Sequence, residues 1–194
     1  MARLLEYGEL LSDATHRMGI VSRGDRDRLL RKHVRESLAV ELVNALPQGA
    51  RVLDVGAGGG LPGIPLAIVR GDLRVTLLEV RARKAAFLER AKMMLKLTNV
   101  DVLPCPMESV RANNAVNTGT TIGWDVAVSR AVAWTRPMVR ALRDCVSQDG
   151  QLIRFGSSTG EFPGDVRIVL LEGPEPRALQ FWPPETWDGL PEAK

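Results

Sequence analysis

The chain has 194 residues, of which 45% are hydrophobic and 25% charged, and its formal net charge at pH 7 is +3. This composition is ordinary for a globular protein and excludes disordered and collagen-like classes. No apolar run approaches the ~20 residues that a membrane-spanning helix needs, so we expect no membrane segment. The first residues, MARLLEYGELL, include acidic side chains and lack the apolar core of a secretion signal.

Two cysteines and two histidines leave little material for disulfides or metal sites. Cys105 and Cys145 are far apart in the sequence and belong to no C-x-x-C motif, which is typical of reduced thiols inside a cell. We therefore expect a cytoplasmic protein, monomeric and without a bound metal ion.

Residues 1–46 are predicted to form a helical N-terminal extension, because apolar residues recur there at near-helical spacing until Pro47 and Gly49. Residues 47–194 are predicted to be a single globular domain of alternating strands and helices. The expected strands are 51–55, 74–79, 100–103, 124–129, 151–155, 166–171 and 178–182. The expected helices are 62–70, 82–97 and 136–146, with a loop over 111–123. The alternation predicts an α/β fold with a mostly parallel sheet, helices on both faces and an antiparallel edge formed by the last two strands.

The most informative segment is 51–65, RVLDVGAGGGLPGIP, in which a short apolar strand leads through a glycine-rich turn to a proline-opened helix. Glycines allow the backbone to turn sharply and to approach a ligand closely. The spacing is D-x-G-x-G-x-G, formed by Asp54, Gly56, Gly58 and Gly60. The next strand ends in Glu79, about 20 residues further on, where an acid can accept hydrogen bonds from a ribose.

These features predict a nucleoside-containing cofactor at the carboxyl edge of the sheet. An acid directly before the first glycine would repel a pyrophosphate, but it suits the cationic amino-acid tail of S-adenosylmethionine. Two other interpretations stay open, namely a nicotinamide or flavin dinucleotide and a glycine-rich turn that binds nothing.

Basic residues are concentrated in two segments, 17–35 and 81–96, whereas the last forty residues lean acidic. A basic face suggests a polyanionic partner such as RNA, and a solvated helix surface is the alternative. From this pattern and from their positions further along the chain, the candidate RNA-binding residues are Arg28, Arg31, Arg35, Arg136 and Arg154.

Three segments, DVGAGGGLPGIPLAIV, VTLLEVRARKAAFLERAKMMLKLTNV and VSRAVA, together resemble the RsmG (GidB) family. The resemblance covers roughly residues 33–156 and includes HVRESLAV at 33–40. Members of this family are S-adenosylmethionine-dependent methyltransferases that act on N7 of a guanine in bacterial 16S ribosomal RNA. The resemblance therefore implies a Rossmann-like class I methyltransferase fold, S-adenosyl-L-methionine as cofactor, and 16S ribosomal RNA or the small ribosomal subunit as partner.

The resemblance also assigns residues. Gly56 and Leu61 match the family's cofactor turn, and Glu79 matches its ribose-binding acid. Met107 and Glu108 match the pair expected beside the adenine, and Arg130 matches the arginine of the S-R-A motif. With Asp54, Gly58 and Gly60 of the turn, these are the expected cofactor-binding residues.

The sequence departs from the family pattern mainly where RNA would bind. The family's N-L-T segment is not recognisable, and its L-K-G motif reads RFG at 154–156, so that its lysine is either lost or displaced by one position to Arg154. These departures leave two alternative functions open: a small-molecule methyltransferase on the same fold, and a non-catalytic protein that binds RNA or the cofactor.

Guanine N7 carries an unprotonated lone pair, so we expect no general base and no catalytic residue in the strict sense. Arg130 is expected to position the substrate at the junction with the cofactor. The alternative is a structural ion pair between Arg130 and Asp54 or Glu108.

Overall fold

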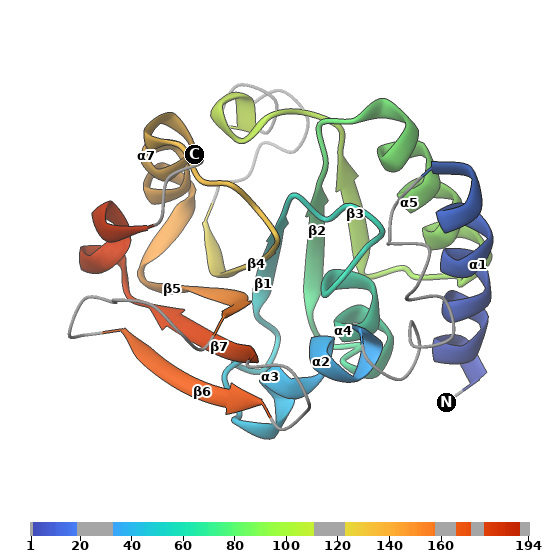
Figure 1. Cartoon of the computed structure of the whole chain (residues 1–194), viewed down its shortest axis with the longest axis horizontal. Coiled ribbons are helices and arrows are strands. Elements are labelled where there is room, and N and C mark those ends of the chain that lie inside the picture. Colours follow the sequence, from blue (N-terminus) through green and yellow to red (C-terminus); the bar gives the residue numbers. More distant parts are fainter. Residues whose placement is uncertain (1, 19–32, 111–122, 158–165, 172–176, 191–194) are drawn as a thin grey trace.

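The computed structural model describes residues 2–18, 33–110, 123–157, 166–171 and 177–190, and its framework is one twisted sheet with helices on both faces (Figure 1). The seven strands are β1 (Arg51–Val55), β2 (Arg74–Leu78), β3 (Val100–Leu103), β4 (Trp124–Arg130), β5 (Val146–Ser157), β6 (Arg167–Leu171) and β7 (Arg177–Trp182). Their order across the sheet is β3-β2-β1-β4-β5-β7-β6.

Strands β1 to β5 pair in parallel, whereas β7 is antiparallel to both of its neighbours, β5 and β6. The predicted antiparallel edge formed by the last two strands is therefore confirmed. Of these two strands only β7 runs opposite to β1 to β5, and the edge strand β6 runs in the same direction as they do. Without β7 the order is that of a Rossmann-type sheet, in which ligands bind outside the carboxyl ends of the strands where the order reverses, here beside β1.

The helices divide between the two faces. They include α1 (Ala2–Met18), α4 (Gly63–Val69), α5 (Ala82–Met94), α7 (Arg136–Cys145) and the 3-10 helices η3 (Met107–Ser109) and η4 (Pro184–Gly189). One apolar core joins α1, α4 and α5 to one face of the sheet, and a second joins α7, η3 and η4 to the other. Because side chains alternate along a strand, each strand contributes to both cores. For example, Val128 of β4 belongs to the first core and Ala127 to the second.

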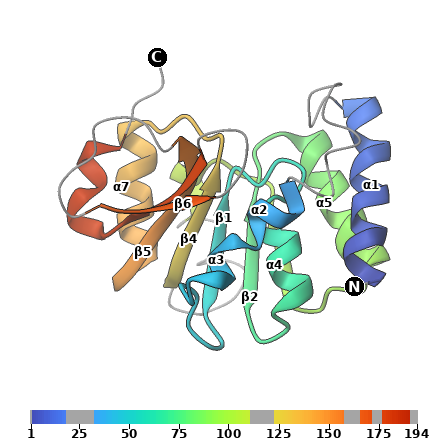
Figure 2. The same ribbon diagram turned by 60° about the horizontal axis from the view of Figure 1, so that its bottom comes forward.

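The prediction of a helical segment over 1–46 holds only in part. After α1, the described residues contain two short helices, α2 (Arg35–Ser37) and α3 (Ala39–Leu42), which lie across the sheet near β1 and α4 (Figure 2). Leu42 has a helical spacing from its apolar neighbours, yet it is 86% exposed. The domain boundary at residue 46 stays a prediction. Tyr7 and Leu11 of α1 belong to the same apolar core as the sheet.

The other elements agree with their predicted positions to within a few residues, except that β5 begins at Val146 rather than at residue 151. The predicted strand omitted this first part because Ser147 to Gly150 are polar or glycine and lack an apolar alternation. The predicted loop at 111–123 lies almost wholly outside the described residues.

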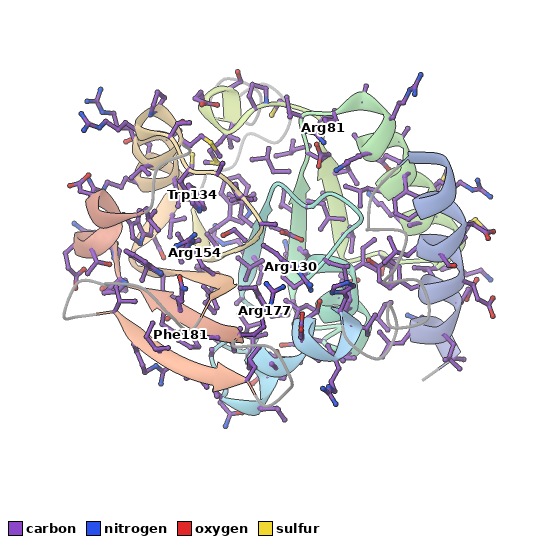
Figure 3. All side chains as sticks on the ribbon, viewed as in Figure 1. Arg81, Arg130, Trp134, Arg154, Arg177 and Phe181 are labelled. Atoms are coloured by element: carbon purple, nitrogen blue, oxygen red, sulfur yellow. The ribbon has the colours of Figure 1, made fainter. Side chains whose placement is uncertain are left out.

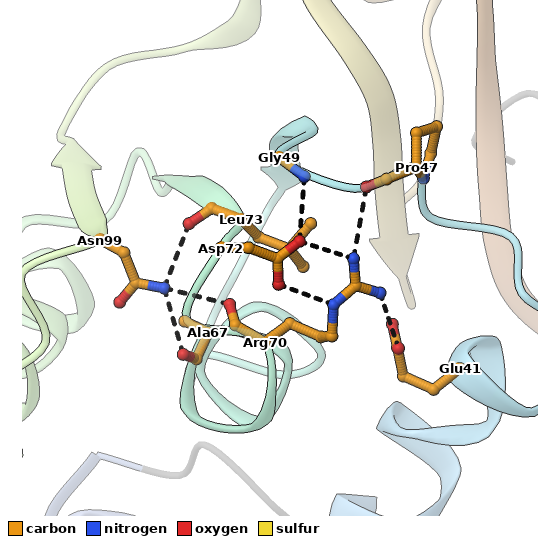
Figure 4. A network of polar contacts seen from close by, with 8 residues as sticks. All are labelled: Glu41, Pro47, Gly49, Ala67, Arg70, Asp72, Leu73 and Asn99. Carbon is orange, nitrogen blue, oxygen red and sulfur yellow. Dashed lines mark hydrogen bonds and ion pairs between the residues drawn. The ribbon is translucent and has the colours of Figure 1, made fainter.

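A polar network at the amino edge of the sheet links several connecting segments (Figure 4). Arg70 donates to both carboxylate oxygens of Asp72 at 2.8 Å and to Glu41 of α3 at 2.9 Å. Asp72 also accepts from the backbone of Gly49 at 2.9 Å, and the Arg70 guanidinium holds the pKa of Asp72 well below its usual range. Asn99 donates to three carbonyls at the end of α4 and the start of β2. The network fixes the edge opposite the predicted site.

Helix α1 is attached to the glycine turn by Tyr7, whose buried hydroxyl donates to the carbonyl of Gly59 at 2.7 Å. Tyr7→Phe leaves that carbonyl without its partner and should lower the free energy of unfolding by about 1–3 kcal/mol. Chemical denaturation measures the change, with Leu5→Ala on the exposed side of the same helix as control. Equal stabilities of the Tyr7→Phe variant and the unaltered protein would show that this bond contributes nothing.

Candidate cofactor and substrate site

The glycine turn after β1 adopts a conformation that other residues rarely accept. Gly56, Gly58 and Gly60 have φ angles of +70°, +59° and +91°, in the left-handed region that favours glycine. A Cβ atom on Gly60 would lie 2.5 Å from Ile64 of α4, so this glycine allows the turn to pack closely against the helix that follows it. The sequence prediction of a sharp turn is confirmed for all three residues.

Asp54, at the base of the turn, is fully buried. Its Oδ2 accepts from the backbone N–H of Gly63 at 2.9 Å, at the first residue of α4. Its Oδ1 is also buried and has no hydrogen-bond partner among the described residues. Burial, with a further contribution from the negative charge of Glu79, raises the pKa of Asp54 to about 7. The side chain therefore organises the turn, and its unpaired oxygen could accept one further hydrogen bond or cation.

Glu79 connects the end of β2 to the same turn. Its Oε2 accepts from the backbone N–H of Gly58 at 2.9 Å, and its Oε1 accepts from that of Arg81 at 2.8 Å. The residue is only 5% exposed. Each carboxylate oxygen can accept a second hydrogen bond, so Glu79 keeps acceptor capacity for the two hydroxyls of a ribose while it holds the turn.

The turn presents an open face next to these acids. A Cβ atom on Gly58 would lie no closer than 3.7 Å to any atom beyond the two adjacent residues. Space of this kind, beside a turn shaped for glycine and two buried carboxylates, fits the close approach of a nucleoside cofactor. The residues present therefore fit S-adenosylmethionine, which carries both a ribose and a cationic amino-acid tail.

The remaining predicted cofactor residues follow the neighbouring strands. Leu61 is half-buried in the turn, where its peptide bond to Pro62 is cis. Met107 and Glu108 lie in η3, just after β3, with Met107 buried and Glu108 exposed. These positions are all at the carboxyl edge of the sheet, as predicted. Their contact with a cofactor stays a prediction.

Arg130, the last residue of β4, does not pair with Asp54 or Glu108 as the structural alternative supposed. Its Nη2 makes an ion pair with Glu36 at 3.0 Å and also contacts Nδ1 of His33. Its Nη1 is buried and has no hydrogen-bond partner among the described residues. The partners belong to α2 and to the residues just before it, almost a hundred positions away in the sequence, and no local pattern identified them.

The predicted RNA-binding arginines have different surroundings. Arg35 on α2 and Arg136 at the start of α7 are exposed. Arg154 on β5 is half-buried, where it donates to Oε1 of Gln180 at 3.1 Å and lies over the ring of Trp182 at 5.6 Å. Arg28 and Arg31 lie outside the described residues. Contact with RNA stays a prediction for all five.

None of the helices among the described residues is long and apolar enough to cross a membrane. The described residues also contain no group of three or more His, Cys, Asp or Glu residues that could hold a metal ion.

The fold and the glycine turn define an S-adenosylmethionine-dependent methyltransferase of Rossmann-like architecture. Solved structures with the same fold include a mutant of MtNAS in complex with S-adenosylmethionine, with a TM-score of 0.61 and 19% identity over 94% of this chain and 72% of that one. Another is a SAM-dependent methyltransferase from Aquifex aeolicus, with a TM-score of 0.54 and 14% identity over 75% of this chain and 89% of that one.

Residues 1–159 match the sequence model of the GidB family, described as rRNA small subunit methyltransferase G. The chain is 37% identical to ribosomal RNA small subunit methyltransferase G of Nitrosospira multiformis over 96% of its own length and 77% of that protein. Identity to the protein of the same name from Burkholderia multivorans is 35%, over 88% of this chain and 72% of that protein. The chain therefore belongs to the GidB family, and the predicted family, fold and cofactor are confirmed.

The raised pKa of Asp54 predicts a pH dependence of stability. Between pH 4 and 7 the unfolded chain releases the Asp54 proton while the folded chain retains it, so stability falls as the pH rises through this window. Asp54→Asn cannot titrate. The stability of the unaltered protein relative to this variant should therefore decrease from pH 4 to pH 7 and then level off. Urea denaturation at a series of pH values measures this difference, and a difference that is constant across the window would contradict the prediction.

Proposed function

We propose that this protein transfers a methyl group from S-adenosylmethionine to N7 of a guanine in bacterial 16S ribosomal RNA. One observation carries the proposal beyond family membership. The buried carboxylate of Glu79 supports the open glycine turn that follows β1. Arg130, which has an unpaired N–H group, ends β4, the strand next to β1, at the same edge of the sheet. A nucleoside cofactor and an electron-rich acceptor can thus meet at one edge.

The chain's residues would divide the work as follows. Glu79 would accept hydrogen bonds from the ribose, and the unpaired Oδ1 of Asp54 would face the cationic end of the cofactor. Gly56, Gly58, Gly60 and Leu61 would form the surface against which the cofactor lies, with Met107 and Glu108 beside its base. When bound, S-adenosylmethionine supplies a methyl group activated by a positively charged sulfur.

The protein's contribution to the chemical step would be alignment. Guanine N7 has a free lone pair, so no side chain has to remove a proton. Arg130 would position the target nucleotide so that the lone pair faces the methyl carbon at the contact distance of about 3–3.5 Å that such a transfer needs. Glu36 would keep the guanidinium of Arg130 in place for this task.

The decisive experiment is methyl transfer from labelled S-adenosylmethionine to deproteinised 16S ribosomal RNA and to intact small subunits, followed by mapping of the modified base. Label on guanine N7 would support the proposal. Transfer only to small molecules, or binding without turnover, would favour one of the two alternative functions. We also propose that the enzyme is a monomer and acts in the cytoplasm, which light scattering and cell fractionation would test.

Cofactor binding can be separated from turn stability by two alanine variants. Gly58 and Gly49 both have positive φ angles, +59° and +71°, and a Cβ atom meets no close neighbour at either position. Alanine should therefore cost each turn a similar strain energy, about 1–2 kcal/mol. Only Gly58→Ala should weaken binding of S-adenosylmethionine in calorimetry, by about 10-fold or more, because only this Cβ would stand where the cofactor must approach. Equal affinities in the two variants would place the cofactor elsewhere.

The absence of a general base predicts a flat pH profile. The rate of a single turnover at saturating cofactor should change little between about pH 6 and 9, because no group has to remove a proton from the reacting base. Asp54, whose pKa is about 7, would contact the cofactor and not the base, so its titration would affect cofactor affinity and not this rate. Arg130→Ala should lower the rate by ~10–100-fold through lost alignment, without introducing a pH dependence. A rate that rises with a clear pKa in this range, and loses that rise when one residue is changed, would contradict transfer to N7.

A further inference from the structure

A second arginine, Arg177, lies on the same face of the sheet as Arg130. Arg130 pairs with Phe155 of β5, and Phe155 pairs with Leu179 of β7. Arg177 precedes Leu179 by two residues, so both side chains emerge on one face, the one that carries the first core. Because β7 is antiparallel, its first residue lies at the carboxyl edge of β5. The topology therefore brings the start of β7 to the site.

The register places Arg177 close enough to the Arg130–Glu36 pair for its charge to act on both groups. Burial opposes ionisation of Glu36, but His33 and Arg130 outweigh it and lower the pKa of this carboxyl, and the positive charge of Arg177 adds to their effect. Burial is the main cause that lowers the pKa of Arg130, and the charge of Arg177 lowers it further. Figure 3 shows Arg130 and Arg177 next to each other beside α2. Two guanidinium groups thus lie near the carboxylate of Glu36.

One hydrogen-bond donor of Arg130 is unsatisfied. Its Nη1 atom is buried and has no partner among the described residues. A buried, charged donor without an acceptor is costly, and neighbouring like charges raise the cost further. An anion with several oxygens would accept a hydrogen bond from the unpaired donor and would offset the neighbouring positive charges. Arginine binds phosphate with particularly good geometric fit.

We propose that Arg177 and Arg130 together bind a backbone phosphate of the RNA substrate next to the target base. The inference rests on the proposed function, and it places a substrate-binding residue in the part of the chain that the family model does not match, since that match ends at residue 159. Glu36 holds Arg130 in position, and Arg177 approaches the same phosphate from β7, on the other side of β5.

The register also resolves the question of the family's L-K-G lysine. The lysine corresponds to Phe155, which faces the first core, whereas Arg154 contacts Gln180 and Trp182 on the opposite face. Arg154 therefore does not replace the lysine in space. Arg177 supplies a positive charge on the face of Phe155, two residues nearer to the carboxyl edge.

The test compares two arginine variants on the same face of the sheet. Arg177→Ala removes the proposed phosphate contact. Arg167→Ala is the matched control, because Arg167 pairs with Phe181, towards the other end of β7, and lies over its ring at 4.1 Å. Affinity for a 16S ribosomal RNA fragment is measured over a series of salt concentrations, with cofactor affinity and melting temperature measured in parallel.

Arg177→Ala should weaken RNA binding about 10-fold and reduce the slope of log affinity against log salt by about 1, which corresponds to one lost phosphate contact. Arg177→Lys, which keeps the charge, should retain the slope. Arg167→Ala should leave both affinity and slope unchanged, and cofactor affinity should be unchanged in all three variants. The same slope in Arg177→Ala as in the unaltered protein, or an equal loss in Arg167→Ala, would overturn the inference.

Two further measurements keep the test decisive. If Arg177→Ala does not fold, the double variant Phe155→Lys/Arg177→Ala is used, which moves the positive charge to the neighbouring strand β5. This variant should bind RNA with the original salt slope. A reduced slope in the folded double variant would count against the inference. RNA binding is measured without turnover. An unaltered protein that binds RNA but transfers no methyl group would therefore refute the proposed function, while the response of the Arg177 variants would decide the inference separately.

Discussion

The carboxylate of Glu79 is the constraint on which the candidate site depends. It joins the end of β2 to the N–H of Gly58 and to its own chain at Arg81, while Asp54 joins β1 to the start of α4. Tyr7 adds a third attachment from α1. A glycine-rich turn would otherwise lose much conformational entropy when it becomes ordered around a ligand. Three side chains from three elements order the turn during folding instead, so that it has its binding shape beforehand.

The sheet separates the charges of the site by strand. The acids belong to β1 and β2, on the cofactor side, whereas the arginines belong to β4 and β7, on the substrate side. The inserted antiparallel strand makes this possible, because it returns to the carboxyl edge and begins there with Arg177. The network around Arg70 lies at the opposite edge, where it holds connecting segments that do not belong to the candidate site. Among the described residues, the carboxyl edge keeps buried polar atoms without a hydrogen-bond partner, including Oδ1 of Asp54 and Nη1 of Arg130, although Oε1 of Glu41 in the Arg70 network is also unpaired.

Local patterns in the sequence were sufficient for the strands and for the glycine turn, because apolar runs and left-handed glycines leave direct signals. They were insufficient wherever a residue acts through a distant partner. Nothing near Tyr7 marks it as the partner of Gly59, 52 residues away, and nothing near Arg130 points to Glu36. Likewise, Arg154 was a reasonable candidate from its position in the sequence, but which face of the sheet it occupies depends on strand register. The edge position of β6 follows from strand order, which periodicity does not encode.

A pair of arginines raises a difficulty for the proposed chemistry that the arrangement itself resolves. Methylation of neutral guanine at N7 leaves a positive charge on the base, and Arg130 and Arg177 would repel that charge as it develops. Glu36 offsets part of their field. A phosphate bound between the arginines would offset more, at a fixed position and without reorganisation during the reaction. The RNA backbone would therefore assist the chemical step as well as binding, and a site lined with arginines could serve a reaction whose product is a cation.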